Sequence, residues 1–406
     1  MVVRVAKPAF NLRDKLSELD KPVGFKGSEL MKSNNVQEAR DLISAGRRNM
    51  IINGSMAVAQ RGTSAAAQSF TTPGYPVCDR WQFRALNTDQ ANYDISNPTD
   101  APYGVCTKSL KVDVNAAETA IDANELFWTA QTIEAQNCSN LGFGSKSASD
   151  ITISFWVKTN VTGRYALYLY SQDPHRYITR TYNVNVSGTW EKKIINIPGD
   201  HAGAVINHDN GIGIKIYWIL MAGSDYTSVN SSLGWTGYDQ DGIAYNHDVN
   251  IASSTSNYWQ LTGVQVEKGK NGTDFEYRSH GEELALCQRY FTVFPPRSGG
   301  IPGWVMYTGA NQASAHVWIP HTMRGTPTPT DAGTGTSTTT GHAYNHNGTS
   351  VSTRYANGTS PTLSCGGENG HYGINMHFGA HSSGTHEADV ASWNGTSPGI
   401  FLSAEL

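Results

Sequence analysis

One-for-one alternation of apolar and polar residues is the feature that most constrains the fold of this chain. In residues 151–158 every odd position is apolar, and residues 212–218 repeat the pattern with apolar residues at even positions. A period of two is typical of a β-strand with one buried face. Residues 165–170 and 190–197 are rich in aromatic and branched side chains, which favour strands. The middle of the chain is therefore predicted to be β-structure.

Within residues 258–266 the alternation changes phase. Trp259 and Leu261 are apolar at odd positions, whereas Val264 and Val266 are apolar at even ones. An extra residue in a strand produces such a shift, so we expect a β-bulge near Gly263. Strands at this spacing, separated by Asn, Gly and Asp, predict a two-sheet sandwich of jelly-roll type rather than a βαβ fold. Trp81, Trp156 and Trp259 lie inside these runs and are expected in the core or on a sheet face.

The amino-acid composition argues against nucleic acid and membranes as partners. Charged residues make up 16% of the chain and the formal net charge is −4, without a long basic stripe. Nucleic acid is therefore not an expected partner, since its binding needs clustered cations. No run approaches the roughly 18 apolar residues that cross a bilayer, so membrane insertion is not expected either. Five cysteines without a C-x-x-C spacing indicate buried free thiols rather than disulfides or a zinc site.

The first 46 residues differ from the rest by their helical periodicity. One short helix is predicted after Asn11, and a second begins at Asn35 with a capping box and ends at Gly46. Helices this short need a partner to be stable in water. Packing on the following domain and contacts in virion docking or trimerisation are both open for their apolar residues, which are Leu12, Leu16, Leu19, Val36, Ala39, Leu42 and Ile43.

The whole chain is predicted to be mainly β, in four parts. A helical N-terminal anchor spans 1–46, a central jelly-roll β-sandwich spans 47–280, a helical joint spans 281–298, and a smaller C-terminal β-domain spans 299–406. The joint is expected to contain a helix from Gly281 to Phe291, closed by Pro295 and Pro296. Short apolar runs predict strands in the last part, at 304–307, 316–319 and 400–402.

Catalytic signatures are missing from the sequence. It contains no nucleophile elbow, Walker loop, dinucleotide fingerprint or His-Glu-x-x-His motif, so an enzyme is not expected. A glycosidase needs only two carboxylates a few ångströms apart, which a sequence does not reveal. A polysaccharide depolymerase therefore stays open as an alternative.

Two groups of residues are candidates for ligand binding. Flat aromatic rings beside amides and hydroxyls suit sugars, and the C-terminal part offers a set that could also be core: Trp304, Tyr307, Trp318, Tyr344, Tyr355, Tyr372 and Trp393. Asp239 and Asp241, followed by Gly242, resemble the opening of a calcium loop, although no Glu completes an EF-hand and a surface turn is the simpler explanation. No other cofactor is predicted, and the histidines beyond residue 300 are too irregularly spaced to define a metal site.

Several stretches resemble tail-fibre and related structural proteins of tailed bacteriophages of the marine podovirus type. They cover roughly residues 47–291, and their order and spacing are more specific than any one of them. The stretches are Arg47–Gly54, Val58–Gly62, Tyr75–Trp81, Ile153–Lys158, Trp190–Lys193, Ile197–Asp200, Trp259–Glu267, Phe275–Ser279 and Glu282–Tyr290.

This resemblance implies a function. In such proteins the matching region is a jelly roll like a carbohydrate-binding module, and the fibres are homotrimers. They are anchored by the N-terminus to the tail nozzle, an adaptor or another virion protein. The C-terminal tip then recognises the host surface, and the aromatic residues above lead us to expect a glycan as its receptor. We expect a non-enzymatic tail-fibre or spike subunit on the virion tail, with a head fibre or decoration protein on the capsid surface as the alternative.

Overall fold

The computed structural model describes the chain from residue 47 onward, with gaps. Its backbone covers 47–294, 303–309, 312–319, 321–331, 340–344, 362–368, 371–379, 389–394 and 400–406, and its side chains cover 47–293, 319, 321–328 and 402–406. The predicted N-terminal helices, with Leu12, Leu16, Leu19, Val36, Ala39, Leu42 and Ile43, lie outside the described residues. Their docking or trimer role stays a prediction.

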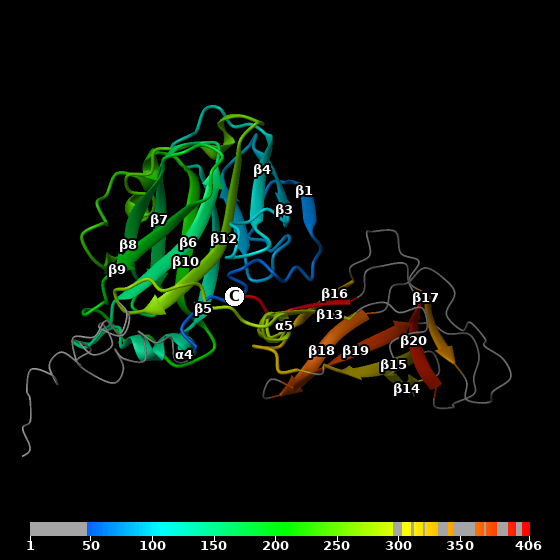
Figure 1. The fold of residues 1–406 in the computed structure, drawn as a ribbon. Helices are drawn as coiled ribbons and strands as arrows, with labels where there is room; N and C mark the ends of the chain where they lie inside the picture. The colour runs from blue at the N-terminus through cyan, green and yellow to red at the C-terminus, as the bar shows by residue number, and fades with distance from the viewer. Residues whose placement is uncertain are drawn as a thin grey trace, which may run out of the picture. The chain divides into compact units, whose positions relative to one another are not determined.

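Two six-stranded antiparallel sheets form the central part as two stacked layers (Figure 1). The first, named here the β12 sheet, has the order β1(Ser64–Gln68), β3(Asn92–Ser96), β4(Leu110–Ala116), β12(Tyr258–Lys268), β6(Ile151–Thr159), β9(Glu191–Ile197). The second, the β10 sheet, has the order β11(Thr236–Gly237), β8(Arg176–Val184), β7(Gly163–Ser171), β10(Ile212–Ala222), β5(Leu126–Glu134), β2(Gln82–Leu86).

The core lies between these two sheets. Phe155 of β6 and Trp218 of β10 are fully buried, and their ring centroids are 5.7 Å apart. Trp81 packs on Trp218 at 5.4 Å, and Trp259 is also fully buried. Burial of such aromatic side chains contributes roughly 1.5–3 kcal/mol each. The predictions of a two-sheet sandwich and of core positions for Trp81 and Trp259 are therefore confirmed.

Strand β6 departs from its predicted half-buried state. Its odd residues face the core, but Thr152 and Ser154 on the other face are buried as well. The reason is the segment after β12, which folds over this face, where the Thr152 hydroxyl donates a hydrogen bond to the Gly269 carbonyl at 2.7 Å. Tertiary cover thus buries positions that the alternation assigns to solvent.

The bulge predicted near Gly263 is present. The register of β12 against β6 shifts between Thr262 and Gln265, and Gly263 has a φ of +61°. A side chain there would be strained by this φ and would approach the Trp156 ring to 3.0 Å. Glycine is therefore required by both the backbone and the packing.

The four edges of the two sheets differ in structure. At the edges of the β12 sheet, β1 contains a register shift between Ala65 and Gln68, and β9 begins with Glu191, Lys192 and Lys193. In the β10 sheet, β11 has only two residues. The outer edge of β2 is covered by Gly74, which exchanges two backbone hydrogen bonds with Phe83.

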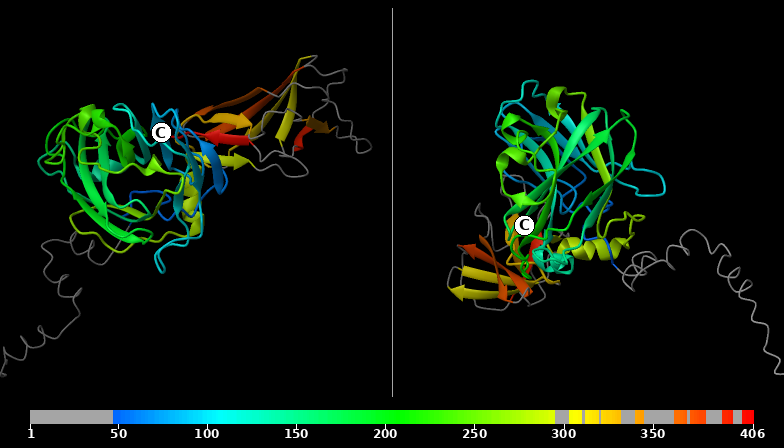
Figure 2. Two further views of the ribbon diagram at one scale, coloured as in Figure 1. Left: turned by 90° about the horizontal axis from the view of Figure 1, so that it is seen from above. Right: turned by 90° about the vertical axis from the view of Figure 1, so that its left-hand side faces the viewer.

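Short helices lie at one end of the sandwich. Helix α5(His280–Gln288) and helix α4(Ala135–Cys138) lie at the same end in Figures 1 and 2. Ser279 caps α5 in a capping box with Glu282, as its sequence favours. The helix ends three residues earlier than predicted, because Phe291 pairs with Ser403 in a strand instead. The described 3-10 turns are η1(Ser139–Leu141), η2(Ser224–Tyr226), η3(Gln240–Gly242) and η4(Ile251–Ser253).

The C-terminal part contains two further sheets. One has the order β13(Phe291–Phe294), β21(Ile400–Ser403), β16(Thr328–Asp331). The other has the order β17(Thr340–Tyr344), β20(Asp389–Asn394), β14(Gly303–Gly309), β15(Gln312–Trp318), β19(His371–Gly379), β18(Thr362–Glu368). The strands predicted at 304–307, 316–319 and 400–402 are confirmed, whereas the domain boundaries stay predictions.

Two predictions from composition can be compared with the described residues. Four of the five cysteines are described as free thiols, of which Cys78, Cys138 and Cys287 are buried and Cys106 is half-buried. Among the helices that the structure describes, none is long and apolar enough to cross a membrane.

Candidate functional site

The outward face of the β10 sheet carries aromatic side chains where a simple sandwich would carry polar ones. On β7, Tyr165 points into the core, whereas Tyr168 and Tyr170 have the opposite parity and face outward. The register places Tyr168 opposite Tyr217 of β10 and Tyr170 opposite Tyr177 of β8. Aromatic rings from three neighbouring strands thus lie on one surface.

A long loop between β10 and β12, residues 223–257, partly covers this surface. Tyr226 and Ile243 from the loop are buried against Trp128 and Tyr168 of the sheet. The loop is held by hydrogen bonds, such as the one from the Thr179 hydroxyl to the Gly242 carbonyl at 2.8 Å. Because part of the face stays uncovered, a hollow remains between the loop and the strands.

This hollow, called the aromatic groove, has a volume of about 340 Å³. Rings dominate its lining, which contains no Asp or Glu among the residues that the structure describes. The lining residues are Arg84, Leu86, Leu126, Trp128, Tyr168, Tyr170, His175, Tyr217, Tyr226, Tyr238, Gln240 and Ile243. A concave, mostly apolar site with a few polar groups is the usual form of a small-ligand site.

The rings hold one another in place. Tyr217 lies edge-on to Trp128 with centroids 4.8 Å apart, and it contacts Tyr168 at 5.0 Å. Further along, Tyr238 lies 5.7 Å from Tyr170 and 5.1 Å from His175. Packed rings on sheet strands form a rigid surface, so little side-chain entropy is left to lose on binding.

The groove also offers hydrogen-bonding groups. Burial raises the pKa of Tyr168 and of Tyr217, so both hydroxyls stay protonated and neutral near pH 7. The Tyr170 hydroxyl is hydrogen-bonded to Nδ1 of His175, which fixes the orientation of both rings. Neutral hydroxyls both donate and accept hydrogen bonds. The groove can therefore contact an apolar ring face and hydroxyl groups at the same time.

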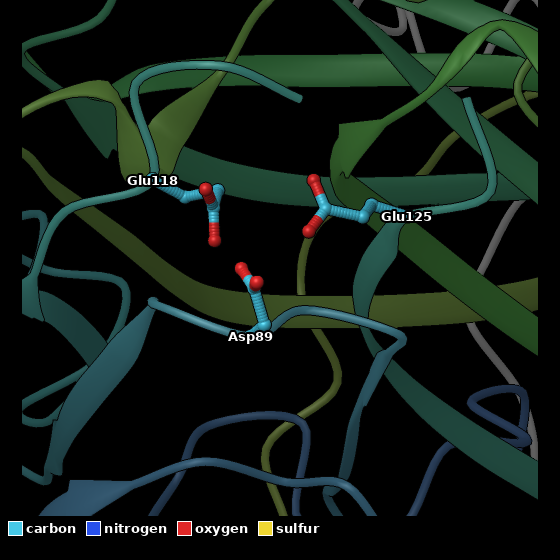
Figure 3. A group of neighbouring side chains, drawn as sticks. All are labelled: Asp89, Glu118 and Glu125. Atoms are coloured by element: carbon cyan, nitrogen blue, oxygen red, sulfur yellow. The ribbon is translucent and has the colours of Figure 1, made fainter. Parts of the chain in front are cut away.

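Three carboxylates meet elsewhere, on the loops between β2 and β3 and between β4 and β5. Oxygen atoms of Asp89, Glu118 and Glu125 lie within 4.8 Å of one another, and Figure 3 shows the three groups converging. Oxygen ligands of this kind suit Ca²⁺, so these residues can hold a divalent cation. Since acidic groups also gather without a metal, no metal is assigned to them.

The calcium candidates from the sequence have a different role in the structure. The Asp239 carboxylate accepts a hydrogen bond from the Asp241 backbone N–H at 3.1 Å and caps the turn η3. Both side chains are exposed, and neither belongs to a group of three or more potential ligands among the described residues. The alternative of a surface turn accounts for this geometry.

The C-terminal aromatic candidates lie mostly on strands whose side chains are outside the described part. Their backbones are on β14 (Trp304, Tyr307), β15 (Trp318), β17 (Tyr344), β19 (Tyr372) and β20 (Trp393), and Tyr355 lies outside the described residues. The register sets Trp304 and Tyr344 both opposite Val390. Glycan binding by these seven residues stays a prediction.

The aromatic groove was not among the sites predicted from the sequence. A signal was present in residues 165–170, where apolar or aromatic residues occupy both parities of the strand, although only one sheet face was expected to be buried. Tyr217 stands in the same way between Ile216 and Trp218. Outward aromatic residues on two neighbouring strands are the pattern that could have indicated this site.

Comparisons with known proteins give distant structural similarities only. No protein-family model and no curated protein sequence matches the chain. The enzymatically active domain of tailspike protein 4 of bacteriophage CBA120 has 12% identity and a TM-score of 0.28, over 54% of this chain and 21% of that one. The chain thus spans about a fifth of the length of that structure.

Two sugar-binding structures give similar values. A family 11 carbohydrate-binding module from Clostridium thermocellum, in complex with a β-1,3-1,4-mixed-linked tetrasaccharide, has 9% identity and a TM-score of 0.25, over 52% of this chain and 98% of that one. A putative sugar-binding protein from Bacteroides thetaiotaomicron has 10% identity and a TM-score of 0.28, over 54% and 100%. TM-scores this low do not establish a common fold, so the function must be inferred from the residues themselves.

Proposed function

We propose that the central sandwich binds carbohydrate in the aromatic groove of the β10 sheet. The observation that carries this proposal is the combination of rigid tyrosine and tryptophan rings with neutral hydroxyls in one groove. Sugars present C–H-rich faces that stack on aromatic rings, and hydroxyls that pair with polar groups at the rim. A ligand of this class uses both kinds of group that the groove offers.

Two groove tyrosines give the direct test. Tyr217→Ala and Tyr238→Ala each remove a ring that is partly open to solvent and thus available to a ligand. We expect each variant to lose about tenfold in affinity for bound polysaccharide, which corresponds to about 1.4 kcal/mol. Affinity gel electrophoresis against a panel of neutral and acidic polysaccharides, followed by calorimetry on the ones retained, measures the change.

Tyr103→Ala is the matched control, because Tyr103 is fully exposed and lies outside the groove lining. It should bind like the unmodified protein. Failure of the unmodified protein to bind any polysaccharide of the panel would contradict the proposal, as would equal losses in Tyr103→Ala and the groove variants.

We further propose that the chain is a subunit of a phage tail fibre or spike, with a jelly roll of carbohydrate-binding-module type at its centre. Support comes from the resemblance of the stretches within residues 47–291, most of which lie in the strands and turns of the sandwich. A homotrimer on the virion tail, docked through residues 1–46 and touching the host surface through residues 299–406, remains part of this proposal. The groove adds a second place for contact with a host glycan.

A further inference from the structure

Two cations lie together at one end of the aromatic groove. Arg84 of β2 lines the groove directly, opposite Trp128 in the register. Lys215 of β10 lies beside it, with Nζ 4.9 Å from the Trp128 ring centroid and 5.1 Å from the Tyr217 centroid. Arg84 thus belongs to the lining of the groove, and Lys215 lies against two of the rings that would stack on a ligand.

No carboxylate neutralises this pair among the residues that the structure describes. Arg84 makes no ion pair there, and its buried Nε has no hydrogen-bond partner. Lys215 donates to the neutral Gln82 side chain at 2.5 Å and forms no ion pair within the same residues. Burial, followed by repulsion from Arg84 and Arg80, lowers the pKa of Lys215 to about 8. Positive charge is thus concentrated here without a protein counterion.

Two acidic residues lie near other parts of the groove. Asp239 follows β11, which forms the opposite edge of the sheet from β2. Its negative charge adds to the effect of burial in raising the pKa of Tyr177 and of Tyr238. In the covering loop, the charge of Asp225 adds to burial in raising the pKa of Tyr226. Neither carboxylate forms an ion pair with Arg84 or Lys215 in the described part of the chain. The groove is therefore electrostatically uneven, cationic at its β2 end.

Uncompensated charge in a partly buried site is costly unless a ligand supplies the opposite charge. A guanidinium binds a carboxylate in a planar, often bidentate arrangement, and Arg84 lines the groove without an ion pair to any residue that the structure describes. On the proposed function of carbohydrate binding, we infer that the groove selects acidic glycans, polymers whose sugar residues carry carboxylates. Arg84 contacts the carboxylate, and Lys215 adds charge from beneath the rings.

Chemical reduction of the carboxyl groups of a polysaccharide tests the preference for acidic glycans directly. Polygalacturonate, alginate and hyaluronan are each compared with the carboxyl-reduced form of the same polymer, which keeps the backbone and removes the charge. We expect the full chain to bind at least one acidic form at least tenfold more tightly than its reduced form. The difference should shrink as salt rises from about 50 to 300 mM, because screening weakens exposed charge pairs.

Variants test the assignment to these two side chains. Arg84→Gln and Lys215→Met should each reduce the ratio of acidic to neutral affinity at least threefold. Lys192→Gln is the control, because Lys192 is exposed on β9 of the other sheet. This substitution removes one positive charge outside the groove. Thermal unfolding of each variant verifies that it is folded.

The outcomes separate the two proposals. Equal or tighter binding to the neutral forms overturns the acidic preference and leaves carbohydrate binding intact. Acidic preference that survives both groove variants, or that Lys192→Gln removes equally, overturns the role of Arg84 and Lys215. Binding to none of the acidic, reduced or other neutral polysaccharides contradicts this inference and the proposed function together.

Discussion

The carboxylate of Glu125 lies close to those of Asp89 and Glu118. Burial raises its pKa, and the charges of Glu118, Asp122 and Asp89 raise it further. A carboxyl whose pKa is raised by folding binds its proton more tightly in the folded state. Its ionisation therefore removes stability as the pH rises above about 4.3, the ordinary value for glutamate.

Glu125→Gln should stabilise the protein at pH 7, by a few tenths to about 1 kcal/mol, because it removes the repulsion and keeps an acceptor for the Asp122 backbone N–H. Thermal unfolding in buffer with EDTA, which excludes a compensating divalent cation, measures the effect. The gain should shrink as the pH falls toward 4. A lower midpoint for the variant at pH 7 would refute the prediction.

Strand parity determines which residues of the site could be predicted from sequence. Alternation correctly assigned Phe155 and Trp218 to the core, because a strand with one buried face has a clear period of two. Tyr168 and Tyr170 do not follow this alternation, because they are aromatic on the outer face, part of which loop residues 223–257 cover. The outward aromatic residues mark this sheet face in the sequence. The covering loop is distant in sequence and leaves no local signal, so the strand and its aromatic face could be predicted, whereas the shape of the groove could not.

At the scale of elements, one buried carboxylate joins β5 to the segment after α5. Glu134, at the end of β5, accepts hydrogen bonds from Nε and Nη2 of Arg289 at 2.9 and 3.0 Å, and another from the Tyr290 hydroxyl. Burial alone would raise the pKa of Glu134, but the bonds from Arg289 and Tyr290 outweigh it and lower the pKa. The pair thus ties the helical joint to the sandwich.

Arg289→Gln should destabilise the protein by about 2 kcal/mol, because it leaves a buried carboxylate short of its cation. Urea unfolding at pH 7 measures the loss. Since folding lowers the pKa of Glu134, its contribution is present above about pH 4.3 and disappears as the pH falls through the folded value. The difference between variant and unmodified protein should therefore narrow in acid.

Lys270→Gln serves as the comparison for this experiment. Its ion pair with Asp150 is 3.5 Å long, and the lysine side chain is 77% exposed, so the change should cost under about 0.5 kcal/mol. Comparable losses for both variants, or a loss for Arg289→Gln that is independent of pH, would argue against a structural role for the Glu134 pair.

Element boundaries were harder to predict than element types. The start of the helix at His280–Gln288 follows from its own capping residues, Ser279 and Glu282, which are only three residues apart in sequence. Its end does not, because Phe291 belongs to β13 through pairing with β21, more than a hundred residues away. Local signals therefore fixed where the helix begins, and a distant strand fixed where it ends.

At the scale of the whole molecule, the proposed fibre role predicts self-association. Several weak sugar sites displayed together give an avidity that one site lacks. We expect a stable trimer in solution, measured by light scattering coupled to size-exclusion chromatography at micromolar concentration. A monomer under these conditions would count against the fibre proposal but not against glycan binding in the groove.

Deletion of residues 1–46 tests the proposed anchor. The two sheets are built from residues 64–268, so the truncated chain should keep the circular dichroism and unfolding midpoint of the sandwich. In particles it should fail to be incorporated, as judged by antibody labelling of purified virions. The position of the label on particles with the full chain, at the tail or at the capsid surface, separates the fibre from the decoration protein.

The four sheet edges have a consequence for crowded display. Open edges attract strands from neighbouring copies, and natural proteins block them by bulges, charges, short strands or cover. Here each edge carries one of these, namely the register shift in β1, the lysines of β9, the brief β11, and the backbone of Gly74 along β2. Copies of the sandwich held side by side at high local density should therefore remain separate units instead of merging into continuous sheets.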